Sequence, residues 1–256
     1  ILTFFYVIIK LFRRTMFKAL FENISPKNFY NFSSKIIPWA FVTSVVFIGY
    51  GLYLGLFVAP SDYQQGDAFR IIYVHVPSAW LSLFAYSAVF VCSIISLIWK
   101  IKVFEILTIA SAKNGALFTF LALVTGAIWG KPMWGTWWVW DARLTSELIL
   151  LFIYLAIILL YYSFDDYRKG AKAANILAIV GFINIPIIHF SVEWWNTLHQ
   201  GPSVMKFSSP SIASEMLYPL IYTTVGFTAY LVGAILLSSR NDLIIREKNT
   251  NWISSI

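Results

Sequence analysis

The chain has 256 residues, of which 59% are hydrophobic and only 12% are charged, and its mean hydropathy is +0.72. This composition lies far outside the range of soluble globular proteins and is typical of an integral membrane protein. The net charge of +7 does not indicate nucleic-acid binding, because the basic residues lie in short segments between apolar runs, and the single cysteine, Cys92, excludes a disulfide framework or a Cys-x-x-Cys motif.

The N-terminal region precedes the first long apolar segment. Its opening run "ILTFFYVII" is too short to span a membrane, and the basic cluster follows this run, which is the wrong order for a signal peptide. Met16 is a candidate initiator, so we expect residues 1–15 to be a non-native upstream extension. Residues 1–35 are predicted to form an N-terminal cytoplasmic segment.

Six apolar segments reach the length of about 20 residues that a membrane-spanning helix needs. Backbone groups in lipid must be hydrogen-bonded within their own segment, and short alternating strands do not occur, so a helical bundle is favoured over a barrel. We predict an all-α fold with one membrane domain, residues 36–240, and a cytoplasmic tail, residues 241–256. The helices are expected at about 36–58, 79–99, 107–128, 146–163, 174–190 and 217–238.

The basic residues predict the orientation of the bundle. All but four of the 19 Lys and Arg residues lie in the N-terminal segment, the second and fourth loops with the adjoining helix end, and the tail. The exceptions are Arg70, Lys131, Arg143 and Lys206. Positive residues are enriched on the cytoplasmic side, so both termini are expected in the cytoplasm and the first, third and fifth loops on the outer face.

The third loop contains the stretch "WGKPMWGTWWVWDARLTSE", residues 129–147. Tryptophans at membrane interfaces are usually scattered anchors, but five in one loop with Gly130, Pro132 and Gly135 favour a surface of rings that folds over a large, flat, apolar partner. Lys131 and Arg143 beside the rings are donors for carboxylates, so a porphyrin fits well. The tryptophans are Trp129, Trp134, Trp137, Trp138 and Trp140.

A porphyrin iron needs axial ligands, and the chain has three histidines. His75 precedes the second predicted helix and His189 ends the fifth, so both are expected at the outer membrane boundary. Two imidazoles at one level are what bis-histidine haem ligation requires. We therefore predict that His75 and His189 bind the iron of haem b, iron protoporphyrin IX. For His199, on the same face, a structural role and a ligand role are equally consistent with the sequence.

Three motifs in this order, "RIIYVHVPSAW", the tryptophan stretch and "PIIHFSVEWWNTLHQG", resemble the cytochrome c maturation protein C family of tryptophan-rich haem-handling proteins. The resemblance runs from about residue 16 to 240. The start of that family also resembles "MFKALFENISPKNFY", which supports Met16 as the initiator.

The resemblance implies a six-helix protein of the bacterial inner membrane that presents haem at the periplasmic face. The recipient would be a haem chaperone of the cytochrome c maturation protein E type, which takes haem as a covalent adduct. ABC transporter subunits and a small single-span subunit of the same pathway, together with membrane lipid, are the other implied partners. Alternatives are a haem transporter, a cytochrome c synthetase-type haem lyase and a structural assembly subunit.

The resemblance also implies roles for individual residues. His75 and His189 match the axial ligands, and residues 129–141 match the loop that contacts haem. Independently of the resemblance, we expect Arg143, Lys131 or Arg70 to pair with the propionates, because basic side chains bind carboxylates. Asp141 has two equally good interpretations. It either orients the loop or caps the helix that follows.

Overall fold

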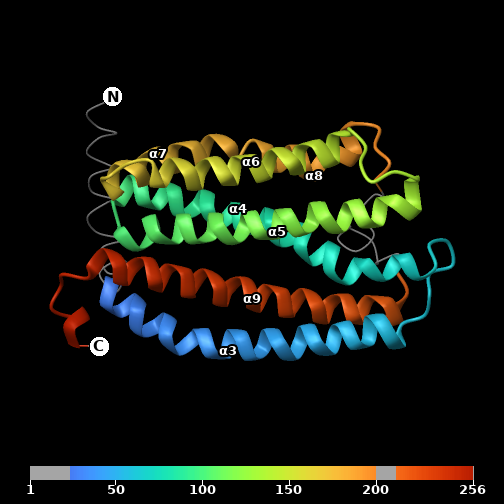
Figure 1. Ribbon diagram of the computed structural model, residues 1–256, viewed down its shortest axis with the longest axis horizontal. Helices are drawn as coiled ribbons and strands as arrows, with labels where there is room; N and C mark the ends of the chain where they lie inside the picture. Colours follow the sequence, from blue (N-terminus) through green and yellow to red (C-terminus); the bar gives the residue numbers. More distant parts are fainter. Residues whose placement is uncertain (1–23, 200–211, 256) are drawn as a thin grey trace, which may run out of the picture.

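The computed structural model describes residues 24–199 and 212–255. All the secondary-structure elements in these residues are helices (Figure 1). The predicted all-α fold is confirmed, because six helical segments are long and apolar enough to cross a membrane. The elements are α3 (Pro26–Tyr53) with a π-helical turn η1 (Leu54–Val58), η2 (Asp67–Ile71), α4 (Ile72–Trp99), α5 (Lys102–Trp134), α6 (Ala142–Tyr162), α7 (Tyr167–Gly181), α8 (Asn184–Trp194), α9 (Ser214–Glu247) and η3 (Ile253–Ser255).

Most of the helices extend beyond the predicted apolar segments. Helix α3 begins ten residues earlier than expected, because the Ser25 side chain accepts a hydrogen bond from the Asn28 backbone at 3.2 Å and Pro26 follows as the first helical residue. The boundaries expected at 35/36 and 240/241 therefore fall inside α3 and α9. Helix α4 begins at Ile72, so His75 lies within its first turn and not before the helix.

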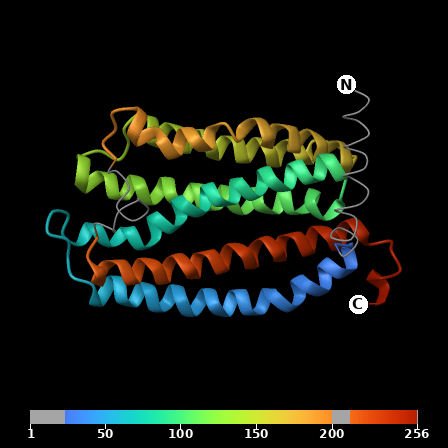
Figure 2. The same ribbon diagram turned by 180° about the vertical axis from the view of Figure 1, so that it is seen from behind.

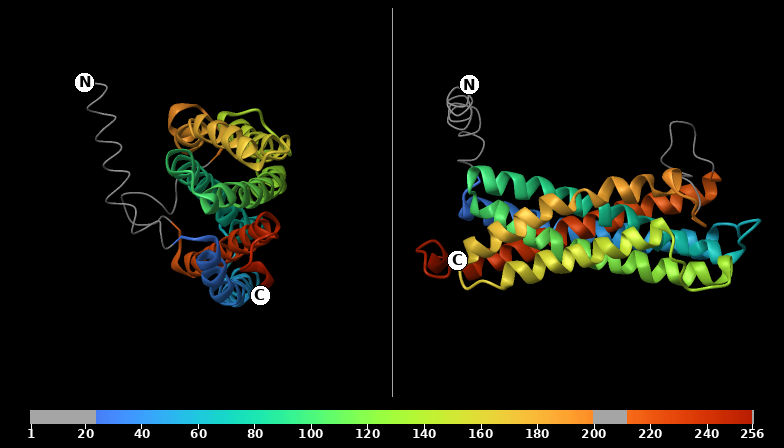
Figure 3. Two further views of the ribbon diagram at one scale, coloured as in Figure 1. Left: turned by 90° about the vertical axis from the view of Figure 1, so that its left-hand side faces the viewer. Right: turned by 90° about the horizontal axis from the view of Figure 1, so that it is seen from above.

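The helices form three stacked pairs (Figures 1 and 3): α3 with α9, α4 with α5, and α6 with the successive helices α7 and α8. The start of α3 and the end of α9 lie at one end of the bundle. The connection between η1 and η2, the tryptophan-rich connection and the end of α8 lie at the other (Figure 2), which we call the loop end. The described chain runs along the bundle six times. Because this number is even, the start of α3 and the end of α9 lie at the same end.

Hydrogen bonds from buried side chains hold the middle pair to its neighbours. The Tyr154 hydroxyl of α6 donates to the Ser82 carbonyl of α4 at 2.7 Å, and the Tyr86 hydroxyl of α4 donates to the Ala178 carbonyl of α7 at 3.1 Å. Helices in lipid associate through close packing and such polar contacts. Gly115 of α5 packs so closely on the Tyr154 ring that an added Cβ would lie 2.3 Å from it.

Ion pairs fix α9 at the end of the bundle opposite the loop end. Arg246 pairs with Glu105 of α5 at 2.8 Å, and Lys113 of α5 pairs with Asp242 at 3.1 Å. These partners explain why α9 stays helical beyond the apolar segment, since its charged residues are neutralised by a neighbouring helix.

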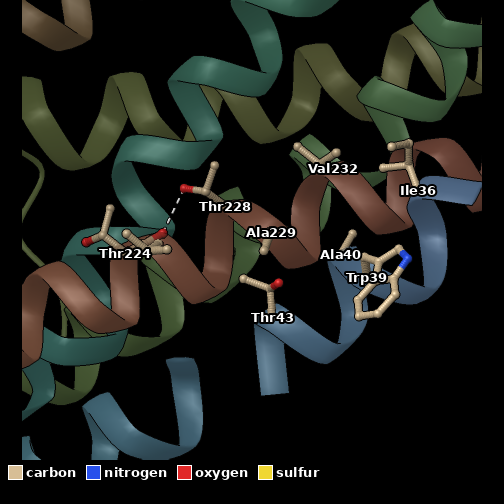
Figure 4. Close-up of a pocket in the computed structure, with 9 residues that line it drawn as sticks. Ile36, Trp39, Ala40, Thr43, Thr224, Thr228, Ala229 and Val232 are labelled. Atoms are coloured by element: carbon tan, nitrogen blue, oxygen red, sulfur yellow. Dashed lines mark hydrogen bonds between the residues drawn. The ribbon is translucent and has the colours of Figure 1, made fainter. Parts of the chain in front are cut away.

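A groove of about 440 Å³ lies between α3 and α9 (Figure 4). Its walls combine small and apolar side chains, and Trp39 at its edge is 73% exposed. None of the residues that the sequence assigns to the haem site lines it. The lining residues are Ile36, Trp39, Ala40, Thr43, Thr224, Val225, Thr228, Ala229 and Val232.

Candidate functional site

His75 lies near the loop end with its ring buried, at 8% exposure. Its Nδ1 is 3.0 Å from the Thr125 hydroxyl of α5, and this hydroxyl donates its own hydrogen to the Leu121 carbonyl at 2.6 Å. The hydroxyl is therefore the acceptor in its contact with His75, which places the imidazole hydrogen on Nδ1. The Nε2 lone pair is left for another partner.

The second histidine at this site is His199, beyond the end of α8. The centroids of the His75 and His199 rings are 6.2 Å apart, and their planes differ by 22°. Burial and, to a smaller extent, the positive charge of Arg143 lower the pKa of His199 to about 4. His199 is consequently neutral near pH 7, as an imidazole must be to coordinate a metal.

Tryptophan rings enclose the two histidines. Trp129 meets the His75 ring edge-on at 5.5 Å, and Trp134 meets the His199 ring edge-on at 5.8 Å. Trp129 also donates from Nε1 to the Gln65 side chain at 2.9 Å, which ties the first loop to α5. The histidine pair is thus positioned from both sides by residues of the tryptophan-rich motif.

A small cavity of about 40 Å³ lies between the histidines and α6. Gly126 lies close to the histidine in its wall, because a Cβ at this position would be 3.1 Å from Cε1 of His75. The cavity is lined by His75, Ala79, Ala122, Leu123, Gly126, Ala127, Trp134, Trp138, Arg143, Leu144, Glu147 and His199.

Two charged residues of α6 face this cavity. Arg143 donates from Nη1 to the Ile188 carbonyl of α8 at 2.8 Å, and Glu147 accepts a hydrogen bond of 2.8 Å from the Ser82 hydroxyl. Glu147 has no role among the expectations drawn from the sequence. It could have been found, because it stands four residues after Arg143 on the same helix face and inside a predicted span, where an ionisable residue is usually functional.

The tryptophans of the predicted haem loop divide into two groups. Trp134 and Trp138 line the cavity, and Trp129 packs behind His75. Trp137 and Trp140 are 56% and 76% exposed. Nε1 of Trp138 is buried and has no hydrogen-bond partner among the described residues. The motif therefore supplies both cavity walls and exposed rings.

The remaining predicted site residues make local contacts. Asp141 caps α6 by accepting from the Leu144 backbone at 2.8 Å, and its second carboxylate oxygen is buried without a described partner. Lys131 is exposed and donates to the Gly135 carbonyl at the end of α5 at 3.0 Å. Arg70 donates to the Gly55 carbonyl at 2.6 Å. Of the basic residues, Arg143 is the one that lines the cavity.

Among the described residues, no ring contact joins His189 to His75. His189 is exposed on α8, it does not line the cavity, and its one described ring contact is with Phe190 at 4.8 Å. The structure therefore brings His75 together with His199 and not with His189. Ligation by His75 and His189 stays a prediction that this arrangement does not favour.

The sequence profile of the family described as "Heme exporter protein C" matches residues 19–254. The chain belongs to this family. Heme exporter protein C of Haemophilus influenzae is 50% identical over 242 residues, which cover 94% of this chain and 98% of the relative. Heme exporter protein C of Escherichia coli is 47% identical over 241 residues, 94% of this chain and 97% of the relative.

Another relative is a mitochondrial protein, matched over a shorter part of this chain. The "putative cytochrome c biosynthesis ccmC-like mitochondrial protein" of Marchantia polymorpha is 49% identical over 194 residues, 76% of this chain and 82% of the relative. The resemblance predicted from the three motifs is thus confirmed. All six spans and every residue that lines the small cavity lie inside the region that matches the heme exporter protein C profile.

Proposed function

We propose that the protein binds haem b between His75 and His199 at the loop end and presents it to a haem chaperone in cytochrome c biogenesis. The short distance between the two imidazole rings carries this proposal. Two metal–nitrogen bonds of about 2 Å in line, one to each ring, separate the ring centroids by about 6 Å, and the centroids of His75 and His199 are 6.2 Å apart. The name of the relatives, heme exporter protein C, also refers to haem.

The hydrogen bond of His75 suits an axial ligand. A metal-bound histidine usually donates its other ring N–H to a fixed acceptor, which sets the tautomer and the ring orientation. Thr125 provides that acceptor from α5. In this proposal, His75 on a rigid helix is the fixed ligand, and His199 in the segment beyond α8 is the ligand that moves to admit haem.

The cavity of about 40 Å³ is too small for a tetrapyrrole, since ligand pockets usually measure about 300–1,000 Å³. Most of the porphyrin would therefore extend past the cavity, where Trp137 and Trp140 are exposed. Trp134 and Trp138 would contact the part nearest the iron, and Arg143 would pair with a propionate. Lys131, which is exposed in the last turn of α5, would pair with the second propionate.

An open porphyrin edge is the feature that presentation requires. A chaperone can approach the vinyl group only if the protein leaves that side free, and the protein would contribute by holding the group in place. We place this event at the periplasmic face of the bacterial inner membrane, as the charge distribution predicts. We also propose ABC transporter subunits and a small single-span subunit as partners. This proposal, like that of the chaperone, rests on the family resemblance.

Transport of haem through the bundle is the competing function. It would need polar side chains that line a path, but two buried polar pairs of the bundle instead join neighbouring helices: Ser82 with Glu147, and Ser93 with Asn175. Such pairing is typical of helix association. Presentation of haem at the loop end requires no polar path through the bundle, so it is compatible with these helix-to-helix contacts. We therefore favour presentation over transport and over a lyase activity.

The ligand pair is tested by absorption spectra of the purified full-length protein. His75→Ala and His199→Ala should each shift the Soret band and lower haem retention, because each removes one of two iron bonds. His189→Ala is the matched control, and it should keep the wild-type spectrum. A wild-type spectrum in both His75→Ala and His199→Ala would refute the proposed site, and a shifted spectrum in His189→Ala would restore the pair predicted from the sequence.

A further inference from the structure

Glu147 places a buried carboxylate in the wall of the small cavity. It lies in the second turn of α6 and is 8% exposed. Among the described residues that line this cavity, Glu147 is the one acidic side chain, and Arg143 is the one basic side chain apart from the histidines. Burial of a carboxylate on a membrane-spanning helix is unfavourable, and such residues usually serve a function.

Ser82 of α4 restrains this carboxylate. Its hydroxyl donates to Oε1 of Glu147 at 2.8 Å. The Ala79 carbonyl lies at the same distance from the hydroxyl, but an ionised carboxylate is the stronger acceptor. The Ser82 carbonyl in turn accepts from the Tyr154 hydroxyl of α6 at 2.7 Å. Helices α4 and α6 are thus joined twice at this level, and the Glu147 side chain is held toward α4.

Arg143 is restrained in another direction. Its Nη1 donates to the Ile188 carbonyl of α8 at 2.8 Å. No direct ion pair joins Arg143 to Glu147 in the part of the chain that the structure describes. The two residues are nevertheless four positions apart on one helix and line the same cavity, so their charges act on one another. The guanidinium and the carboxylate are therefore neighbours that hydrogen bonds hold apart.

We propose that Glu147 is a release residue, which lowers the affinity of the site for a haem propionate so that bound haem can leave. This inference rests on the proposed function, in which Arg143 pairs with a propionate. A propionate that approaches Arg143 also approaches the carboxylate of Glu147, and like charges in a buried site repel each other. The propionate therefore gains less from Arg143 than it would gain beside a neutral residue at position 147.

Two forms of haem separate this charge effect from other effects. The dimethyl ester of iron protoporphyrin IX has the same ring and iron as the free acid but no carboxylates. Each form is titrated into the purified full-length protein at about pH 8, where carboxyl groups are ionised, and binding is read at the Soret band. Glu147→Gln removes the charge and keeps an acceptor oxygen for Ser82. It should bind the free acid about tenfold more tightly than the wild type, and the ester with unchanged affinity.

Three variants complete the comparison. Tyr154→Phe is the matched control, because it removes a hydrogen bond of the same network but no charge, and it should keep the wild-type ratio of the two affinities. Glu147→Asp keeps the charge and should also keep this ratio. Ser82→Ala frees the carboxylate to approach Arg143, so it should weaken binding of the free acid alone. A wild-type ratio in both Glu147→Gln and Ser82→Ala would overturn the inference, and so would weaker binding of the free acid in Glu147→Gln, the result expected if Glu147 only joins helices.

The release rate provides a second measurement. With an excess of a haem-scavenging globin, Glu147→Gln should lose the free acid about tenfold more slowly than the wild type, while the ester should leave both proteins at one rate. Equal release rates for the free acid would overturn the inference. Failure of the proposed function would look different, because Arg143→Met would then bind the free acid as tightly as the wild type.

Discussion

Thr125→Val tests whether His75 is an axial ligand through a residue that would not touch haem. Valine keeps the shape of threonine but removes the acceptor of the hydrogen bond from Nδ1, which is 3.0 Å long. In the haem-free protein the His75 ring can move its hydrogen to Nε2 and avoid an unsatisfied donor. In the haem-bound protein Nε2 would hold the iron, so the hydrogen must stay on Nδ1 without a partner.

The substitution should therefore weaken the bound state more than the free state. His75 is buried, and an unsatisfied buried donor costs about 1–3 kcal/mol. Loss of the acceptor behind a metal-bound histidine typically lowers affinity about 10–100-fold, which is the same range. We expect the haem dissociation constant to rise by that factor while the melting temperature of the haem-free protein changes little.

Titration of haem into purified protein, read at the Soret band, measures this effect. Thr119→Val is the matched control, since Thr119 lies on the same helix and donates to the Gly115 carbonyl at 2.8 Å but has no contact with a histidine. Thr125→Ser, which keeps the hydroxyl, should restore binding. Equal haem affinity in Thr125→Val and Thr119→Val would refute the ligand role of His75.

Two further expectations concern the tryptophan-rich loop. Trp137→Leu/Trp138→Leu should lose about 1–3 kcal/mol of haem binding per stacked ring and should lose chaperone adduct more strongly than haem, both measured in one membrane preparation; normal values for both would assign these rings to lipid anchoring. In a background without Cys92, a cysteine at Thr136 should react with an impermeant thiol reagent added outside and one at Lys169 should not. The opposite labelling pattern would invert the proposed location of the site.

The fold could be predicted because each span is specified by its own residues. About 20 apolar residues in a row identify a membrane-spanning helix without knowledge of any neighbour. The helix ends depend on other information, such as the Ser25 cap or the pairing of Arg246 with Glu105. A count of apolar residues detects neither helix caps nor ion pairs between helices. The predicted helices were therefore too short at most of their ends.

The site could be predicted in part. The tryptophan motif and His75 were recognisable, but the partner of His75 depends on the direction of side chains and not only on their level in the membrane. Asn184, Ile188 and Ser191 are the buried residues of α8. They recur at intervals of four and three, so this spacing indicates the inner face, and His189 lies one residue away from it. The position of His199 depends on the fold of the segment beyond α8, and no local pattern specifies that.

In the proposed function, the division of the tryptophans would follow from the task of a haem carrier that must release haem. A pocket that buries a ligand completely gains affinity from the whole apolar area but blocks the approach of a second protein. Here the enclosed part of the site is small: His75 is buried, and the cavity beside it measures about 40 Å³. In the proposed site, two iron bonds would supply specificity for haem, and the exposed rings of Trp137 and Trp140 would supply contact area that a chaperone could replace. Strong coordination at the iron combined with weak enclosure of the porphyrin edge would then permit both retention and transfer.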